Sequence, residues 1–131
     1  MAAAQGHAEA QHNLGVVHYH GHGGPQDHEE ARRLYGLAVA QGHVEAQYRL
    51  GQMHYNGEGS PQDHQEARRL YGLAVAQGHA EAQANLGFMH VKGEGGPQDH
   101  EEARRLYGLA AAQGSVDARQ ALEKLARASA D

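Results

Sequence analysis

The chain has no cysteine, tryptophan, isoleucine or threonine among its 131 residues. The lack of cysteine excludes disulfide bonds and thiol chemistry, so folding does not require an oxidising compartment. No segment reaches the ~18 consecutive apolar residues typical of a membrane-spanning helix, and Met1–Gly6 lacks the basic and apolar parts of a signal peptide. For the sequence as given, these absences favour a cytoplasmic protein without a membrane partner.

Large apolar side chains are also scarce, because the chain has one phenylalanine and six tyrosines. The abundance of alanine and leucine predicts a thin, closely packed core made of many modest contacts. The net charge is −5 with the twelve histidines neutral. Arginine occurs mainly as a recurring Arg-Arg pair beside acidic residues, so we expect no basic surface for nucleic acid.

One segment of the chain occurs three times with almost no change, at Pro25–Gly42, Pro61–Gly78 and Pro97–Gly114. The copies are 36 residues apart. Self-similarity at such a period marks structural units that cannot bury a core alone and must stack on their neighbours. We divide the chain into a stub, three repeats and a C-terminal capping helix, at residues 1–6, 7–42, 43–78, 79–114 and 115–131.

Each repeat is predicted to form two helices, which we name helix A and helix B. Apolar residues at helical spacing indicate helix A over residues 7–20 and at the equivalent positions of the other repeats. Helix B begins after an aspartate N-cap, Asp27 in the first repeat, with Glu30 placed to complete a capping box, and it ends at Gly42. The predicted fold is all-α: a right-handed α/α solenoid of about three and a half helix-turn-helix repeats.

Three further features of the helices follow from the pattern. The predicted buried stripe of helix B consists of Ala31, Leu34, Tyr35 and Ala38 and their copies. A glycine follows the leucine of each helix A, which predicts a close helix crossing at Gly15, Gly51 and Gly87. We also expect Glu29 to pair with Arg33 at i,i+4 spacing.

The two ends of the array differ in character. Residues 2–6 are identical to residues 110–114, the end of the third helix B, so they correspond to the end of a preceding repeat. The first helix A then has no full helix B before it. We therefore expect exposed apolar surface around Ala10 and Leu14 and weak end-to-end self-association. Residues 115–129 carry many charged side chains, which predicts a polar capping helix.

This repeat resembles the Sel-one-like repeat (SLR) family, whose members are related to the tetratricopeptide repeats. The resemblance covers nearly the whole chain and rests on Ala10, Leu14, Gly15, Gly21, Gly23, Pro25, Asp27, Ala31, Leu34, Tyr35, Ala38 and Gly42 and their copies. It implies an α/α superhelix with a scaffolding or adaptor role through protein contacts, and no catalysis. The chain departs from the family by having histidine at two positions per repeat where tyrosine is common.

Nucleophiles and secluded carboxylates are lacking, so we expect no enzyme: the serines, Ser60, Ser115 and Ser129, have no evident histidine and acid beside them. The histidines offer a second interpretation. Each repeat places two histidines ten residues apart across a glycine turn, and the first repeat adds a short histidine-rich run. The candidate metal ligands are His18, His20, His22, His28, His54, His64, His90 and His100. Hydrogen bonding in the core and adventitious uptake of zinc, nickel or copper are the alternatives, and no cofactor is expected.

Variation between the repeats gathers on one face of helix A, whereas helix B scarcely changes. Aromatic and apolar residues recur on this face, so we expect a concave groove for a protein or peptide. The predicted groove consists of His12, Val16, Tyr19, His20, Tyr48, Gln52, Tyr55, Asn56, Ala84, Phe88, Val91 and Lys92. Arg32 and Arg68 of helix B are expected to be exposed and outside the groove.

The sequence therefore leaves three hypotheses for function. The leading one is a non-catalytic scaffold that binds a protein or peptide on the concave face. The second is a histidine-based metal-binding protein. The third is a consensus-like or engineered repeat module without a natural ligand, which the near-identical copies of helix B suggest.

Overall fold

A computed structural model describes residues 2–130 of the chain, and their side chains from residue 6 to residue 128. The described residues form seven α-helices and no strand. The helices are α1 (Ala2–His20), α2 (His28–Val39), α3 (Val44–Asn56), α4 (His64–Ala76), α5 (Ala80–Lys92), α6 (His100–Ala112) and α7 (Val116–Ala130). The all-α prediction is confirmed. No helix in this part of the chain has both the length and the apolar character of a membrane span.

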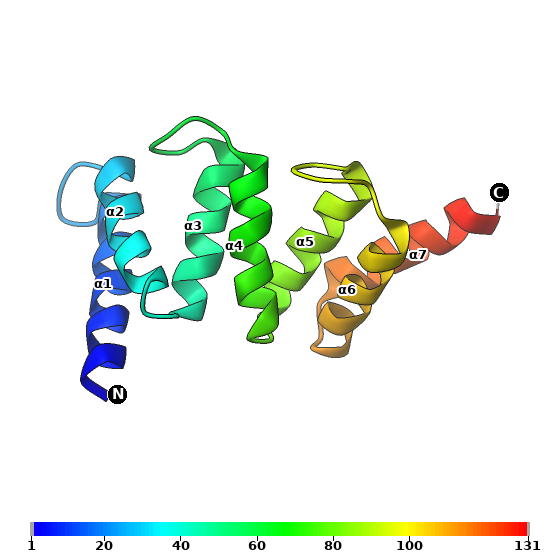
Figure 1. Cartoon of the computed structure of the whole chain (residues 1–131), viewed down its shortest axis with the longest axis horizontal. Coiled ribbons are helices and arrows are strands. Elements are labelled where there is room, and N and C mark those ends of the chain that lie inside the picture. Colours follow the sequence, from blue (N-terminus) through cyan, green and yellow to red (C-terminus); the bar gives the residue numbers. More distant parts are fainter. Residues whose placement is uncertain (1, 131) are drawn as a thin grey trace.

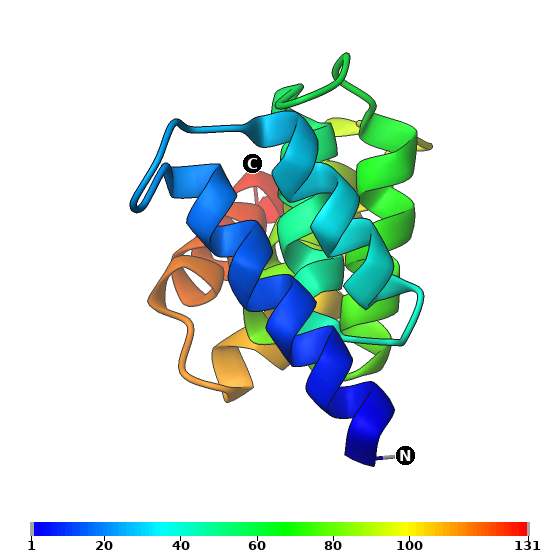
Figure 2. The ribbon, with the colours of Figure 1, turned by 90° about the vertical axis from the view of Figure 1, so that its left-hand side faces the viewer.

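The helices form a linear stack in which each one packs mainly against its neighbours in sequence (Figure 1). Figure 2 views the stack from the α1 end and shows α1 crossing in front, with α2 beside it and α4 at the right of the molecule. Helices α1, α3, α5 and α7 form the layer of A-type helices, and α2, α4 and α6 form the layer of B helices. This arrangement is an α/α solenoid, as predicted.

The core lies between the two layers, and the predicted stripe of helix B is buried in all three repeats. Close crossing explains why glycine recurs at the same position of helix A in each repeat. A Cβ atom added to Gly51 would lie 2.9 Å from two ring atoms of Tyr71, and one added to Gly15 would lie 2.7 Å from a ring atom of Tyr35. Since real Cβ atoms do not approach other atoms so closely, glycine lets the tyrosine ring lie flat against helix A.

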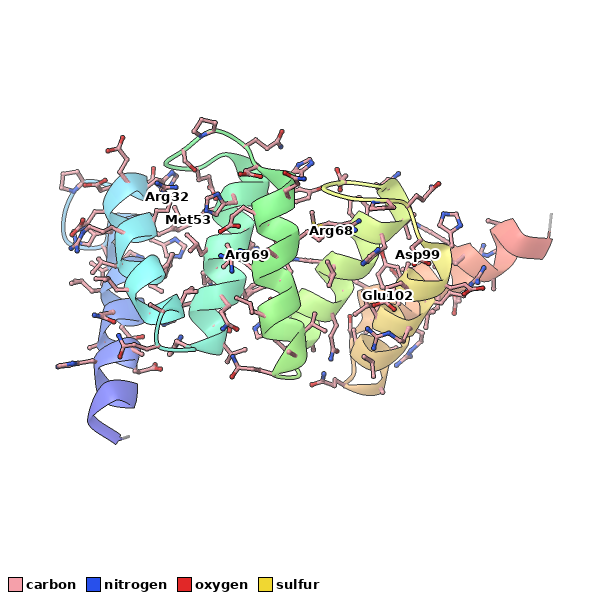
Figure 3. All side chains as sticks on the ribbon, viewed as in Figure 1. Arg32, Met53, Arg68, Arg69, Asp99 and Glu102 are labelled. Carbon is pink, nitrogen blue, oxygen red and sulfur yellow. The ribbon has the colours of Figure 1, made fainter. Side chains whose placement is uncertain are left out.

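Helix B starts at its aspartate N-cap, but the expected capping box is only half formed. The Oδ1 atom of Asp27 accepts a hydrogen bond from the Glu30 amide at 3.0 Å. The Glu30 carboxylate does not return this bond, because it accepts two bonds of 2.7 Å from Arg33. The predicted Glu29–Arg33 pair is thus replaced by a Glu30–Arg33 pair at i,i+3. The same arrangement recurs in the other two copies, where Figure 3 labels Arg69, Asp99 and Glu102.

Residues 2–6 were expected to form a separate stub before helix A, but α1 runs from Ala2 to His20 without interruption. In the later repeats a glycine with positive φ separates helix B from the next helix A, as at Gly42 with φ of 80°. The equivalent Gly6 lies within α1 and continues the helix instead. The first A-type helix is therefore 19 residues long, whereas α3 and α5 have 13.

Polar bonds that join successive repeats recur along the stack. Gln77 donates to the Gly42 carbonyl and to the Gln47 side chain, both at 3.0 Å, and Gln113 makes the equivalent bonds one repeat later. Arg68 was expected to be exposed, yet it reaches from α4 toward α5 (Figure 3) and donates to the carbonyl of Glu94 at 3.1 Å. Arg68 is therefore a link between repeats rather than a free surface cation.

Candidate binding groove

The face formed by the A-type helices is hollowed between successive helices. One hollow of about 260 Å³ lies between α3 and α5, and a second of about 390 Å³ lies between α5 and α7. We name the two together the A-helix groove. The first hollow is lined by Gln52, Tyr55, Asn56, Tyr71, Asn85 and Phe88. The second is lined by Tyr48, Glu81, Ala84, Asn85, Phe88, Tyr107, Ser115, Asp117 and Ala121.

Phe88 is the apolar centre of the A-helix groove, because it borders both hollows. Its side chain is 43% exposed, which is unusual for the one phenylalanine of a protein with a small core. The Nζ atom of Lys92 lies 5.7 Å from the centre of the Phe88 ring. An aromatic ring held beside a cation at the junction of two hollows is a suitable anchor point for a ligand side chain.

Tyr55 forms part of the wall of the first hollow and is fixed by two contacts. Its hydroxyl donates to Glu94 Oε1 at 2.8 Å, and its ring stacks on His64 with ring centres 4.6 Å apart. Partial burial and the Glu94 carboxylate raise the pKa of Tyr55 to about 12, so the hydroxyl stays protonated and keeps donating. Tyr19 makes the equivalent hydrogen bond to Glu58 at 2.7 Å. These tyrosines join repeats as well as lining hollows of the A-helix face.

Two of the residues predicted for the groove are mostly buried. His12 is 9% exposed and Tyr48 is 5% exposed. The Tyr48 ring lies against His79 and Tyr71, with ring centres 4.6 and 5.9 Å apart. This position varies between repeats, yet it faces helix B and the start of the next repeat rather than open solvent. The variation at this position therefore lies within the core, where His12 and Tyr48 fill equivalent spaces in successive repeats.

The other predicted groove residues divide into three groups. Gln52, Asn56 and Phe88 line the first hollow with Tyr55, and Ala84 lines the second. Tyr19 and His20 border a smaller hollow between α1 and α3. Val16 and Val91 pack instead against core clusters.

The sequence reasoning missed Asn85, which lines both hollows. Its equivalents are Asn13 and Arg49, so this position also varies between repeats, and that variation was the available signal. Tyr71 and Tyr107 were treated as core residues only, although each borders a hollow. They were missed because repeats that keep the same residue give no sign that it also reaches a surface.

None of the eight histidines predicted as metal ligands belongs to a group of three ligands in the part of the chain that the structure describes. His20 and His22 stack with ring centres 5.3 Å apart. His28 stacks on Tyr19. Burial lowers the pKa of His54 and of His90, so both rings are neutral near pH 7, and the Nδ1 atom of each is buried without a partner.

A different trio, Glu9, His12 and His43, has ligand atoms within 4.8 Å of one another. His43 is already engaged at both nitrogens: Nε2 lies 2.7 Å from Glu9, and Nδ1 accepts the Ala46 amide at 3.1 Å as the N-cap of α3. A metal at Nε2 would leave Nδ1 protonated and break this cap. The His12 and His43 rings are stacked, so one ion cannot lie in both ring planes. The trio therefore suits helix capping better than metal binding.

The same capping contact recurs one repeat later, where His79 bonds Glu45 at 2.9 Å and caps α5. Tyr48 there takes the place of His12. The histidine at the start of helix A is thus the N-cap of the helix in the second and third repeats.

The geometry defines a helical repeat protein of the solenoid class with a hollowed A-helix face. The family model of the Sel1 repeat matches residues 8–43, 44–79 and 80–115. The chain therefore belongs to the Sel1 repeat family, whose members are generally non-catalytic scaffolds for protein interaction. Comparison with curated proteins gave no match.

Three solved structures illustrate the similarity. A protective antigen of uropathogenic Escherichia coli with an SLR fold is 36% identical, with a TM-score of 0.85 over 89% of this chain and 25% of that one. A Sel1 repeat protein of Oxalobacter formigenes is 31% identical, with a TM-score of 0.85 over 88% of this chain and 47% of that one. Cysteine rich protein B of Helicobacter pylori, at 20% identity and a TM-score of 0.73, covers 92% of each chain and shares the fold. The present chain spans about a quarter and about half of the length of the first two.

Proposed function

We propose that the chain is a non-catalytic scaffold that binds a peptide segment of a partner protein in the A-helix groove. The observation that carries the proposal is Phe88, a half-exposed aromatic side chain shared by two adjoining hollows. Interfaces derive most of their affinity from a few such apolar anchors surrounded by polar groups.

The polar lining indicates what the bound segment looks like. Gln52, Asn56 and Asn85 each offer an amide that can donate and accept hydrogen bonds, which suits the backbone of an extended peptide. Beside them the first hollow has room for one apolar or aromatic side chain against Phe88. Glu81 and Asp117 line the second hollow, so a basic residue further along the peptide would find acidic partners there. The expected ligand is an extended peptide with an apolar anchor and a basic flank.

A peptide-library selection on the immobilised protein tests this proposal. We expect selected peptides to share an apolar anchor residue and to lose binding to Phe88→Ala. The matched control is Leu73→Ala, which removes a similarly exposed apolar side chain from the B-helix layer. Peptides that bind Phe88→Ala as well as the unchanged protein, or that depend on Leu73, would contradict the assignment of the groove.

The tyrosine of the groove requires a milder variant than alanine. Tyr55→Ala would remove both the stack on His64 and the bond to Glu94, so a loss of binding could reflect a disturbed repeat contact. Tyr55→Phe keeps the ring and removes only the hydroxyl. We expect peptide binding to survive Tyr55→Phe, since the hydroxyl is already occupied by Glu94.

A further inference from the structure

Successive A-type helices meet at packed aromatic rings in the first two of their three junctions. Between α1 and α3, the rings of His12 and His43 stack with centres 4.8 Å apart, and the Tyr35 ring of helix B lies 5.7 Å from that of His12. Between α3 and α5, Tyr48 takes the place of His12, and its ring centre lies 4.6 Å from that of His79. Two rings therefore fill each of these junctions beside the tyrosine of helix B.

The junction between α5 and α7 has neither of these two rings. The equivalent residues are Ala84 and Ser115, whereas the helix B tyrosine is still present as Tyr107. Ala84, Ser115 and Tyr107 all line the second hollow of the A-helix groove, which measures about 390 Å³. The second hollow thus lies where two rings pack in the earlier junctions.

A carboxylate accompanies the histidine ring in the first two junctions. Glu9 Oε2 lies 2.7 Å from His43 Nε2, and Glu45 Oε2 lies 2.9 Å from His79 Nε2. Glu81 is the equivalent acid of the third junction, and it lines the second hollow. The third junction therefore keeps the hydrogen-bond acceptor but lacks the histidine.

Ser115 replaces only one of the two contacts of that histidine. Its Oγ accepts a hydrogen bond from the Ala118 amide at 3.1 Å and so caps α7, as His79 Nδ1 caps α5, but it brings no ring into the hollow. Glu81 also acts on the Tyr48 hydroxyl of the opposite wall, because burial first and this carboxylate second raise the pKa of Tyr48 to about 12. A carboxylate has about four lone-pair sites, so Glu81 can accept a further N–H.

The rest of the lining favours a donor over an acid. Asp117 adds a second carboxylate, Asn85 adds an amide, and none of the described residues that line this hollow is basic. Electrostatic complementarity therefore selects a group that carries N–H bonds or a positive charge.

We propose that the second hollow binds the imidazole ring of a histidine in the bound peptide, with the ring in the place that His79 fills one repeat earlier and its N–H donating to Glu81. An imidazole has at least one N–H in either charge state, so the contact does not require a protonated ring. The inference rests on the proposed function, because the peptide in the A-helix groove supplies the ring. It specifies the basic flank of that peptide as a histidine.

The compound 4-methylimidazole, the isolated side chain of histidine, tests the site without a peptide. Its binding is followed by NMR through the signals of Tyr107 and Ala121, which line the hollow. The control compound is 4-methylthiazole, which has the same ring size and methyl group but no N–H.

Three variants are compared with the unchanged protein. Glu81→Gln removes the charged acceptor, and Glu101→Gln is the matched control for an exposed acid in the B-helix layer. The double variant Ala84→Tyr/Ser115→His restores the two rings of the preceding junction. Melting temperatures establish that all three are folded.

We expect 4-methylimidazole to bind the unchanged protein and Glu101→Gln alike. It should bind Glu81→Gln about tenfold more weakly, because a hydrogen bond to a charged acceptor is lost. The compound without N–H should bind the unchanged protein about tenfold more weakly for the same reason. The double variant should not bind 4-methylimidazole, since its own rings fill the hollow. The proposal is overturned by the absence of a saturable shift, by equal binding of the two compounds, or by unimpaired binding to Glu81→Gln or to the double variant.

Peptides selected on the groove separate this inference from the proposed function. Phe88-dependent peptides should contain a histidine, and replacing that histidine by phenylalanine should weaken binding to the unchanged protein but not to Glu81→Gln. Phe88-dependent peptides that bind Glu81→Gln as well as the unchanged protein overturn this inference and leave the proposed function standing. Binding of 4-methylimidazole in the hollow, without any Phe88-dependent peptide, overturns the proposed function and supports the site.

Discussion

The two helix layers of the protein differ in how much their sequences vary, although each contributes one helix to every repeat. The B helices are almost identical along the chain, even at exposed positions such as Leu37 and Leu73, and each packs between its own helix A and the next A-type helix. The A-type helices differ from repeat to repeat where they line hollows, as at Gln52 and Phe88. A position that contacts no neighbouring helix is free to vary. Variation therefore indicates surface positions of the array, except where one core side chain replaces another.

The largest expected effect on stability comes from truncating, one at a time, two aromatic side chains that lie close together in different layers. Tyr71 of α4 is only 2% exposed although it borders the first hollow, whereas Phe88 of α5 is 43% exposed. Tyr71→Ala should lower the free energy of unfolding by about 3–5 kcal/mol, because it loses buried area and leaves a cavity.

The effect of Phe88→Ala on the free energy of unfolding should be well below that of Tyr71→Ala. Denaturant unfolding followed by circular dichroism measures both variants. Equal losses of stability would mean that Phe88 is a core residue and that the groove has been placed on the wrong face.

Replacing glycine by alanine should change stability by a smaller amount, with opposite signs in the two layers. Gly51→Ala places a Cβ atom 2.9 Å from the Tyr71 ring, which cannot move aside because it is buried, so stability should fall by about 1–3 kcal/mol. Gly72 of helix B has no atom within 4 Å of its Cβ position. Gly72→Ala should therefore raise stability by about 0.5–1 kcal/mol through better helix propensity. Thermal melts of the two variants should shift in opposite directions.

Mild acid should weaken the protein through its buried histidines. Burial lowers the pKa of His12, His54 and His90 below the ordinary value of 6.5. The unfolded chain then binds more protons than the folded one, so stability is complete above about pH 6.5 and falls as the pH drops below that value. Around His54, Glu66 and Asp63 oppose this shift while Arg32 and Arg69 reinforce it.

Melting temperatures at pH 7.5 and pH 5 measure this loss of stability. The double variant His54→Phe/His90→Phe should lose less stability between the two pH values than the unchanged protein does. A melting temperature that does not change with pH would show that none of these rings is held neutral by the fold. A hydrogen bond from arginine lowers the pKa of each of Glu30, Glu66 and Glu102 below the usual 4.5. Their protonation therefore affects stability only at lower pH.

The smallest effect is expected from metal removal. His43, which shares a cluster with Glu9 and His12, already caps α3, so a chelator should leave the melting temperature unchanged. Elemental analysis of the chelator-treated protein should show far less than one zinc, nickel or copper ion per chain. One equivalent of retained metal together with a lowered melting temperature on its removal would restore the histidine-based hypothesis.

Local patterns were sufficient to predict much of this structure. The 36-residue period, the aspartate N-caps and the buried stripe of helix B are properties of single helices and turns, so neighbouring residues alone determine them.

Contacts between repeats decided the rest, and no local pattern shows them. Arg68 leaves the surface to bond carbonyl groups of the next repeat. Tyr48 varies like a surface residue but lies within the core, because the ring of His79 from the following repeat covers it. Both contacts depend on how closely the next repeat approaches, and that distance is set by the packing of the whole stack.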